Sequence, residues 1–165
     1  MMPSGSLQAG RGDRPGTKTL MIGEEPPRAR PAERVSRRFS NQRRTGTAPE
    51  LLLRRELHRR GRRFRVHCAI PGLPRRRADV VFTRWRLAVF VDGCFWHACP
   101  LHGVLPRSNS EWWTWKLANN RARDVDTDQR LEGLGWRVLR IWEHEPPGSA
   151  CDRVESALGD LAGQA

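Results

Sequence analysis

The segment from Gly93 to Gly103 constrains this chain more than any other part of the sequence. Within it, two cysteines and two histidines fall in nine residues: Cys94, His97, Cys99 and His102. Zinc binds sulfur and nitrogen ligands at such short spacings, and a bound ion would fix the path of the loop. The spacing fits both cysteines and His102 as three ligands, and the fourth would be His97 or, farther along the chain, His144. The alternative is that the cysteines are small buried hydrophobes and the histidines lie at the surface.

Two apolar strands are predicted just before this loop, at Ala78–Thr83 and Leu87–Asp92, with a short turn around Arg84 and Trp85. Both are apolar on two faces, as central strands covered on both sides should be. If the turn centres on residues 84–85, Asp79 lies opposite Phe90, and Asp92 is its diagonal neighbour on the same face.

Two carboxylates in these positions, on Asp79 and Asp92, can share one hard cation such as Mg²⁺, which can also bind a phosphate. Burying both without compensation would cost several kcal/mol, so we expect a cation or an arginine nearby. The alternative is that each aspartate only ends its strand and faces solvent.

The remaining elements complete an α/β architecture. A helix begins at a capping box, with Thr47 as the cap and Glu50 three residues later, and ends at Gly61. The other predicted elements are a strand at Phe64–His67, a helix at Glu111–Gly133 capped by Ser110, a strand at Trp136–Trp142, and a terminal helix capped by Ser149.

The chain of 165 residues suits one domain, and its net charge of +12 indicates a polyanionic partner. Residues 1–48 carry ten basic and four acidic groups, residues 49–80 ten and three, and residues 81–165 ten and eleven. All basic residues except Lys18 and Lys116 are arginines, which bind phosphate in a bidentate manner. Nucleic acid is therefore the expected partner, and a merely solvated or ribosome-associated chain is the alternative.

Residues 1–32 are rich in Gly, Pro, Arg and Glu without apolar periodicity, so we expect a disordered basic tail before a domain at 33–165. We find no apolar run of about 18 residues, which predicts no membrane span. Without a secretory signal pattern, and with cysteines spaced as metal ligands, the sequence predicts a cytosolic location. Cys68 and Cys151 have no assigned role.

Aromatic residues gather after the predicted metal ligands. Phe95 and Trp96 lie inside the loop, and Trp112, Trp113 and Trp115 follow on the next helix. Aromatic side chains are usually core residues. Exposed on a basic protein, however, they can insert between base pairs and open a duplex.

Several segments of the sequence together resemble one known family, the very short patch repair (Vsr) endonucleases. They are Val91–His97, Glu111–Lys116, Asn120–Asp124, Gly135–Leu139, Trp142–Glu143, Ser36–Arg38 and the stretch from Leu73 to Asp79. The resemblance spans about Val35 to Glu145, and the run Gly-Cys-Phe-Trp-His is its most specific part.

The resemblance implies a restriction-endonuclease-like core, with a central mixed β-sheet flanked by helices. It also implies Mg²⁺-dependent nicking of double-stranded DNA, 5′ to the thymine of a T:G mismatch left by deaminated 5-methylcytosine. Asp79 would hold the Mg²⁺ with the main-chain carbonyl of Val91, and His97 would be the general base. Glu50 would position metal-bound water in addition to capping its helix.

The resemblance also implies which residues bind zinc and DNA. It leaves His97 for catalysis and gives zinc to Cys94, Cys99, His102 and His144, where better-known members use three cysteines and one histidine. Phe95, Trp96 and Trp113 would intercalate beside the mismatch, and the further expected DNA contacts are Lys116, Asn120 and Arg123. Val91 and Asp92 replace the family's Thr-His, which removes one phosphate-side contact and makes Asp92 an expected metal-side residue.

The protein expected from this resemblance is a monomer of the bacterial cytoplasm, associated with the nucleoid, with mismatch-repair proteins as candidate partners. Two rival functions remain. One is a restriction-type nuclease that cuts unmismatched or methylated DNA. The other is a non-catalytic zinc module that only binds DNA.

Overall fold

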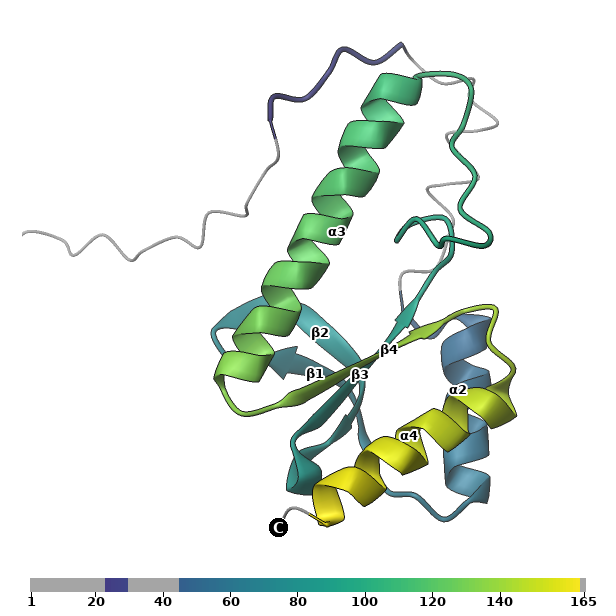
Figure 1. Cartoon of the computed structure of the whole chain (residues 1–165), viewed down its shortest axis with the longest axis vertical. Coiled ribbons are helices and arrows are strands. Elements are labelled where there is room, and N and C mark those ends of the chain that lie inside the picture. Colours follow the sequence, from purple (N-terminus) through teal and green to yellow (C-terminus); the bar gives the residue numbers. More distant parts are fainter. Residues whose placement is uncertain (1–22, 30–44, 164–165) are drawn as a thin grey trace, which may run out of the picture.

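The structure, a computed structural model, describes residues 23–29 and 45–163, and a four-stranded sheet lies at its centre (Figure 1). The strands are adjacent in chain order: β1 (Arg65–Ile70), β2 (Leu73–Phe82), β3 (Leu87–Asp92) and β4 (Arg137–Trp142). The pairs β1–β2 and β2–β3 are antiparallel, whereas β3–β4 is parallel. The prediction of an α/β fold with a mixed central sheet is confirmed.

The β2–β3 connection has the predicted geometry. A single 3-10 turn, η1 (Thr83–Trp85), joins the strands, and Phe82 pairs with Leu87. The pairing continues to Val80 and Val89. The predicted position of Asp79 opposite Phe90 lies one step beyond these pairs and stays a prediction. The short turn fixes this register. The apolar pattern favours the same register, because a shift by one residue would move every apolar side chain of the strand to the opposite face.

Helix α2 (Ala48–Arg59) begins at the predicted capping box. The backbone N–H of Thr47 donates to Glu50 Oε1 at 3.4 Å, and a proline occupies the first turn, where its missing N–H has no cost. The chain leaves the helix through Gly61, whose φ of +75° is a left-handed conformation that glycine adopts without strain.

Helices α3 (Ser110–Gly133) and α4 (Pro147–Ala162) exist where predicted, but both predicted caps are wrong. The N-cap of α3 is Asn109, with φ +55°, and Ser110 is already the first helical residue. The N-cap of α4 is Pro146, and the helix begins two residues before Ser149. The reason at α4 is that a proline fits the first helical turn, so this helix needs no serine to begin.

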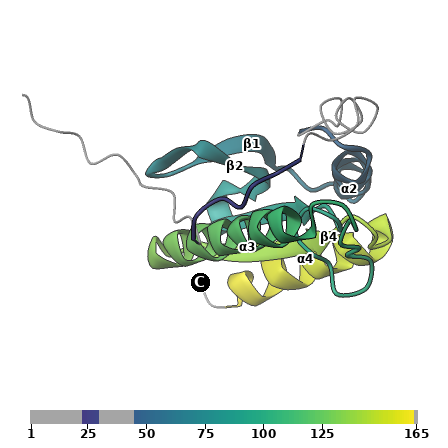
Figure 2. The ribbon, with the colours of Figure 1, turned by 90° about the horizontal axis from the view of Figure 1, so that it is seen from above.

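The helices bury both faces of the sheet (Figures 1 and 2). One apolar cluster joins α2 and α4 to the face that carries Val80, Leu87 and Val89. A second joins the opposite face, which carries Val81, Ala88 and Phe90, to Leu131 of α3. Successive residues of β3 thus enter opposite clusters, which explains its unbroken apolar sequence. Figure 1 shows the amino-terminal half of α3 extending past the sheet, beyond the ends of β3 and β4.

Strands β1 and β2 are longer than predicted. β1 continues to Ile70 and β2 starts at Leu73, with the reversal at Gly72 in a left-handed conformation, φ +74°. The sequence hides this hairpin because a proline and three arginines follow Leu73. Ile70 and Leu73 are nevertheless buried and anchor it to the second apolar cluster.

Residues 23–29 form no helix or strand, but they contact α3. Trp112 Nε1 donates to Glu25 Oε1 at 2.8 Å, the Arg28 guanidinium lies 4.4 Å from the centre of the Trp112 ring, and Asn109 exchanges two hydrogen bonds with the backbone of Ala29. The predicted tail boundary at residues 32 and 33 lies outside the described residues. Within residues 23–29 and 45–163, no helix has the length and apolar character to cross a membrane.

Candidate functional site

Two groups of candidate metal ligands are present among the described residues. One consists of Glu50, His67 and Asp79 from α2, β1 and β2. The other consists of Cys94, Cys99, His102 and His144. Within each group, one ligand atom per residue lies within 4.8 Å of the others.

Asp79 is half-buried, and its Oδ2 accepts the backbone N–H of Val91 at 2.9 Å across the β2–β3 pair. Burial raises the pKa of this carboxyl from 3.8 to about 6, with a further contribution from the charge of Glu50, although the Val91 N–H opposes the shift. A nearby cation would stabilise the charged form of a carboxyl with this raised pKa, so the environment of Asp79 suits a metal ligand.

Glu50 is buried, and both of its oxygens are engaged. Oε2 accepts from the Gly46 N–H and from Arg54 Nη2, each at 2.9 Å, and Oε1 accepts from the hydroxyl and the N–H of Thr47. The capping role is therefore present in the structure. The predicted role with metal-bound water remains a prediction.

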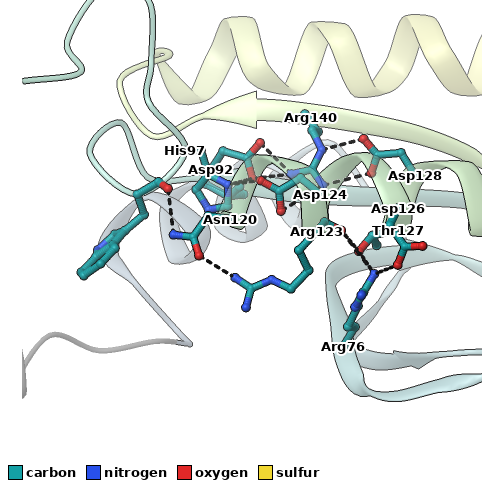
Figure 3. A network of polar contacts seen from close by, with 12 residues as sticks. Arg76, Asp92, His97, Asn120, Arg123, Asp124, Asp126, Thr127, Asp128 and Arg140 are labelled. Carbon is teal, nitrogen blue, oxygen red and sulfur yellow. Dashed lines mark hydrogen bonds and ion pairs between the residues drawn. The ribbon is translucent and has the colours of Figure 1, made fainter. Parts of the chain in front are cut away.

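Asp92 takes part in a different network, shown in Figure 3. Arg140 Nη1 donates to both Asp92 oxygens, at 2.8 and 2.9 Å, and the same guanidinium pairs with Asp128. The expected arginine beside a buried carboxylate is thus Arg140. Asp92 does not belong to the group of Glu50, His67 and Asp79. Its predicted metal-side role stays untested, and its present contacts favour an effect on His97, whose Nδ1 lies 3.6 Å from Asp92 Oδ1.

His97 lies outside the cysteine-histidine group, and its Nδ1 lies 2.6 Å from Asp124 Oδ2 (Figure 3). Burial by itself lowers the pKa of His97, but the hydrogen bond to Asp124 and the charges of Asp92 and Asp124 together raise it above 6.5. A carboxylate at Nδ1 fixes the tautomer and directs Nε2 away from it, the arrangement of an oriented base.

The spacing of the four residues of the cysteine-histidine group suits the ligands of one tetrahedrally coordinated ion. Cys94 Sγ lies 3.0 Å from His144 Nδ1 and 3.9 Å from His102 Nδ1, and Cys99 Sγ lies 3.7 and 3.9 Å from the same two nitrogens. Zinc bond lengths of about 2.3 Å to sulfur and 2.0 Å to nitrogen give a tetrahedral sulfur–nitrogen edge of about 3.5 Å. The donor set and its spacing therefore fit Zn²⁺.

The predicted wedge residues form one aromatic cluster. The Phe95 ring lies 5.1 Å from both Trp96 and Trp113, centre to centre, and Trp96 lies 6.0 Å from Trp113. All three are half-buried. Trp112 packs behind them at 4.8 Å from Trp113 and is buried. The cluster thus has a core side and an accessible side.

The predicted DNA-contact residues on α3 differ in accessibility. Asn120 is buried, and its Nδ2 donates to the Trp96 carbonyl at 3.1 Å, so it holds the aromatic loop in place. Arg123 is exposed, with Nη2 3.3 Å from Asn120 Oδ1, and Lys116 is half-buried on the same helix. Their contacts with DNA remain predictions.

Sequence reasoning gave no role to four residues that the structure places at these sites: His67, Arg54, Asp124 and Arg140. The spacing of Asp124 and Asp128, one turn apart on a helix, was the available signal for a carboxylate pair on one face. The strand prediction that stopped at His67 concealed its position beside Asp79.

Enzymes that act on DNA are the class that the fold, the basic first half and these side-chain groups indicate. Comparison with known proteins narrows this class to one family. The family model described as "DNA mismatch endonuclease Vsr" matches residues 30–101. The chain is 43% identical over 129 residues to a "Type II nicking enzyme V.NaeI" of Lentzea aerocolonigenes, covering 76% of this chain and 77% of the relative. It is 42% identical over 100 residues to the "DNA mismatch endonuclease Vsr" of Escherichia coli K12, covering 59% and 61%.

A third relative, the "Type II nicking enzyme V.XorIIP" of Xanthomonas oryzae, is 44% identical over 102 residues, covering 60% of this chain and 71% of the relative. The chain belongs to the Vsr family of DNA endonucleases.

The Arg140 pairing gives a stability prediction. Arg140→Leu leaves the Asp92 carboxylate, 7% exposed, without its bidentate partner, so we expect a loss of about 3–5 kcal/mol in the free energy of unfolding. Adding Asp92→Asn should restore most of it. The measurement is urea unfolding at pH 7, with Arg137→Leu as the control, because the Arg137–Asp160 pair is largely exposed and should contribute less than about 1 kcal/mol. Equal losses in the two single variants would contradict this account of the network.

Proposed function

We propose that this chain nicks one strand of double-stranded DNA 5′ to the thymine of a T:G mismatch, by Mg²⁺-dependent hydrolysis in a restriction-endonuclease-like core. The mismatch is the product of 5-methylcytosine deamination. The proposal is supported by membership of the Vsr family and by similarity to the E. coli mismatch endonuclease. The observation that carries it is that His97 is held at Nδ1 by Asp124, outside the cysteine-histidine group.

Asp79 and the main-chain carbonyl of Val91 would hold the Mg²⁺. The raised pKa of Asp79 and the nearby Glu50 carboxylate fit a cation at this position. The bound ion would stabilise the negative charge that develops on the scissile phosphate. Glu50, whose oxygens stay in the helix cap, would help to position metal-bound water through its charge.

His97 would take the proton from the attacking water at Nε2, while Asp124 stabilises the resulting imidazolium through Nδ1. Asp92 lies within electrostatic reach of both His97 and Asp79. We propose that Asp92 acts mainly through this field, because Arg140 occupies both of its oxygens.

Zn²⁺ bound by Cys94, Cys99, His102 and His144 would have a structural role. The loop between the two cysteines carries Phe95, Trp96 and His97. A closed four-ligand site would fix this loop and thereby the direction of the catalytic imidazole.

For DNA binding, we propose that Phe95, Trp96 and Trp113 enter the duplex beside the mismatch as one wedge. A T:G pair costs less to unstack than a matched pair, which favours insertion at that point. Arg123 and Lys116 on α3 would contact the phosphates.

A second candidate function is sequence-specific nicking of matched DNA, because two of the relatives reported above are named type II nicking enzymes. The test is single-turnover nicking of two duplexes that differ only in one pair, T:G or T:A, with randomised flanking bases. We expect the T:G duplex to be nicked at least about ten-fold faster. Equal rates would favour the second candidate, and tight binding without cleavage of either duplex would favour a non-catalytic zinc module.

A further inference from the structure

His67 has an unusual backbone for a residue within a strand. Its neighbours pair regularly across the β1–β2 hairpin, Val66 with Val80 and Cys68 with Ala78, so His67 stands beside Asp79. Yet its φ is +50°, in the left-handed region that few residues other than glycine adopt. Such conformations persist where the surrounding structure imposes them, and they gather at functional sites.

The His67 ring is also incompletely satisfied. Nδ1 is buried and has no hydrogen-bond partner among the described residues, and Nε2 lies 3.4 Å from Arg54 Nη2, a long contact. A buried nitrogen without a partner is energetically unfavourable, and a bound ion is one explanation for such an atom. In either neutral tautomer, one ring nitrogen keeps a lone pair that can bind a cation.

The neighbouring donors show which side chains are available for this cation. The four hydrogen bonds to Glu50 use both of its oxygens, so direct ligation would require it to give up part of the helix cap. Asp79 uses Oδ2 for the Val91 N–H, which leaves Oδ1 as its oxygen for a cation. Arg54 Nη2 lies 3.3 Å from the main-chain carbonyl oxygen of Asp79 and 2.9 Å from Glu50 Oε2. These oxygens therefore already stabilise the positive charge of the Arg54 guanidinium beside Asp79.

We propose that His67 supplies a nitrogen ligand to the divalent cation at Asp79, an inference that rests on the proposed function. Mg²⁺ prefers oxygen donors, whereas imidazole favours transition metals. A site made of Asp79 and His67 therefore binds Mn²⁺ with a larger advantage over Mg²⁺ than a site of oxygen donors does. Glu50 remains in the helix cap and acts on the cation through its charge.

The test is pulsed electron paramagnetic resonance of Mn²⁺ bound to the zinc-loaded full chain, which detects nitrogen nuclei coupled to the ion. We expect ¹⁴N coupling in the wild type. The coupling should disappear in His67→Asn, with Mn²⁺ affinity at least about ten-fold weaker and Mg²⁺ affinity less affected. Asparagine tolerates the left-handed backbone, which keeps the substitution local. His58→Asn is the matched control, because His58 is exposed on α2 and packs on Phe64.

Incorporation of ¹⁵N-histidine tests the same claim without a substitution, because the ¹⁴N signal should change to a ¹⁵N signal. Mn²⁺ that binds the wild type without nitrogen coupling, or coupling that survives in His67→Asn, would overturn the inference. Asp79→Asn distinguishes a failure of the His67 inference from a failure of the proposed catalytic site. Loss of Mn²⁺ binding in Asp79→Asn, from a site that shows no nitrogen coupling in the wild type, rejects only the role of His67. Unchanged Mn²⁺ binding in Asp79→Asn rejects the proposed catalytic site itself, and the inference with it.

Discussion

Asp79→Asn is expected to abolish nicking while DNA binding is retained. The amide keeps the shape and can still accept the Val91 N–H through its oxygen, but it loses the charge that holds the cation. Metal stabilisation of the transition state is worth several kcal/mol, so we expect a loss of at least about a thousand-fold in the single-turnover rate. The measurement pairs that rate with the dissociation constant for a T:G duplex.

Asp160→Asn is the matched control, since Asp160 is an exposed aspartate on α4 whose contact is an ion pair with Arg137. It should nick at the wild-type rate. Full activity in Asp79→Asn would remove the catalytic assignment, and a parallel loss of DNA binding would show that Asp79 supports the fold rather than the reaction.

The same substitution should stabilise the metal-free protein at neutral pH. Asp79 has a folded-state pKa of about 6 against an ordinary value of 3.8, so the folded state holds its proton more tightly than the unfolded state. The wild type therefore loses stability relative to Asp79→Asn as the pH rises from 3.8 through 6, by an amount on the order of 3 kcal/mol. Urea unfolding with a chelator of divalent cations, at pH 4.5 and pH 7.5, should show a change of about 2 kcal/mol, because part of the loss already occurs below pH 4.5. A difference that does not change with pH would contradict the burial argument.

The second large effect is expected at the cysteine-histidine group. Cys99→Ser should abolish stoichiometric zinc binding and reduce nicking by at least about a hundred-fold, because His97 lies in the loop between Cys94 and Cys99. Thermal stability should also fall, since zinc binding contributes directly to folding. The measurements are zinc content by elemental analysis, the melting temperature and the nicking rate.

Cys68→Ser is the control for this prediction. Cys68 lies in β1, outside the cysteine-histidine group, and its Sγ is 3.8 Å from the Val66 carbonyl. The control should keep one zinc per chain and normal nicking. If Cys99→Ser nicks normally without zinc, the ion is not what positions His97.

The sequence predicted the architecture well where local rules suffice. The continuous apolar character of Leu87–Asp92 identified a central strand, because each of its faces meets a separate apolar cluster. The capping box of α2 depends only on neighbouring residues, and the β2–β3 register depends only on a three-residue turn. Each of these features could therefore be predicted from the sequence without knowledge of the fold.

Less of the candidate site could be predicted, because its contacts are long-range. Arg140 meets Asp92 only because β4 lies parallel to β3, and it meets Asp128 only because α3 crosses that end of the sheet. The position of His67 depended on a hairpin whose second strand begins at Leu73, among residues that resemble a loop. Spacing likewise left the fourth member of the cysteine-histidine group open between His97 and His144. The family resemblance favoured His144, and the fold brings His144 Nδ1 within 3.0 Å of Cys94 Sγ.

The most direct test of the central claim is the Mg²⁺ dependence of strand cleavage on a T:G duplex labelled on both strands. The expected result is one cut, 5′ to the mismatched thymine, that requires Mg²⁺, leaves the guanine strand intact and is lost in His97→Ala. Cleavage without a divalent cation, cleavage of both strands, or an unchanged rate in His97→Ala would contradict it.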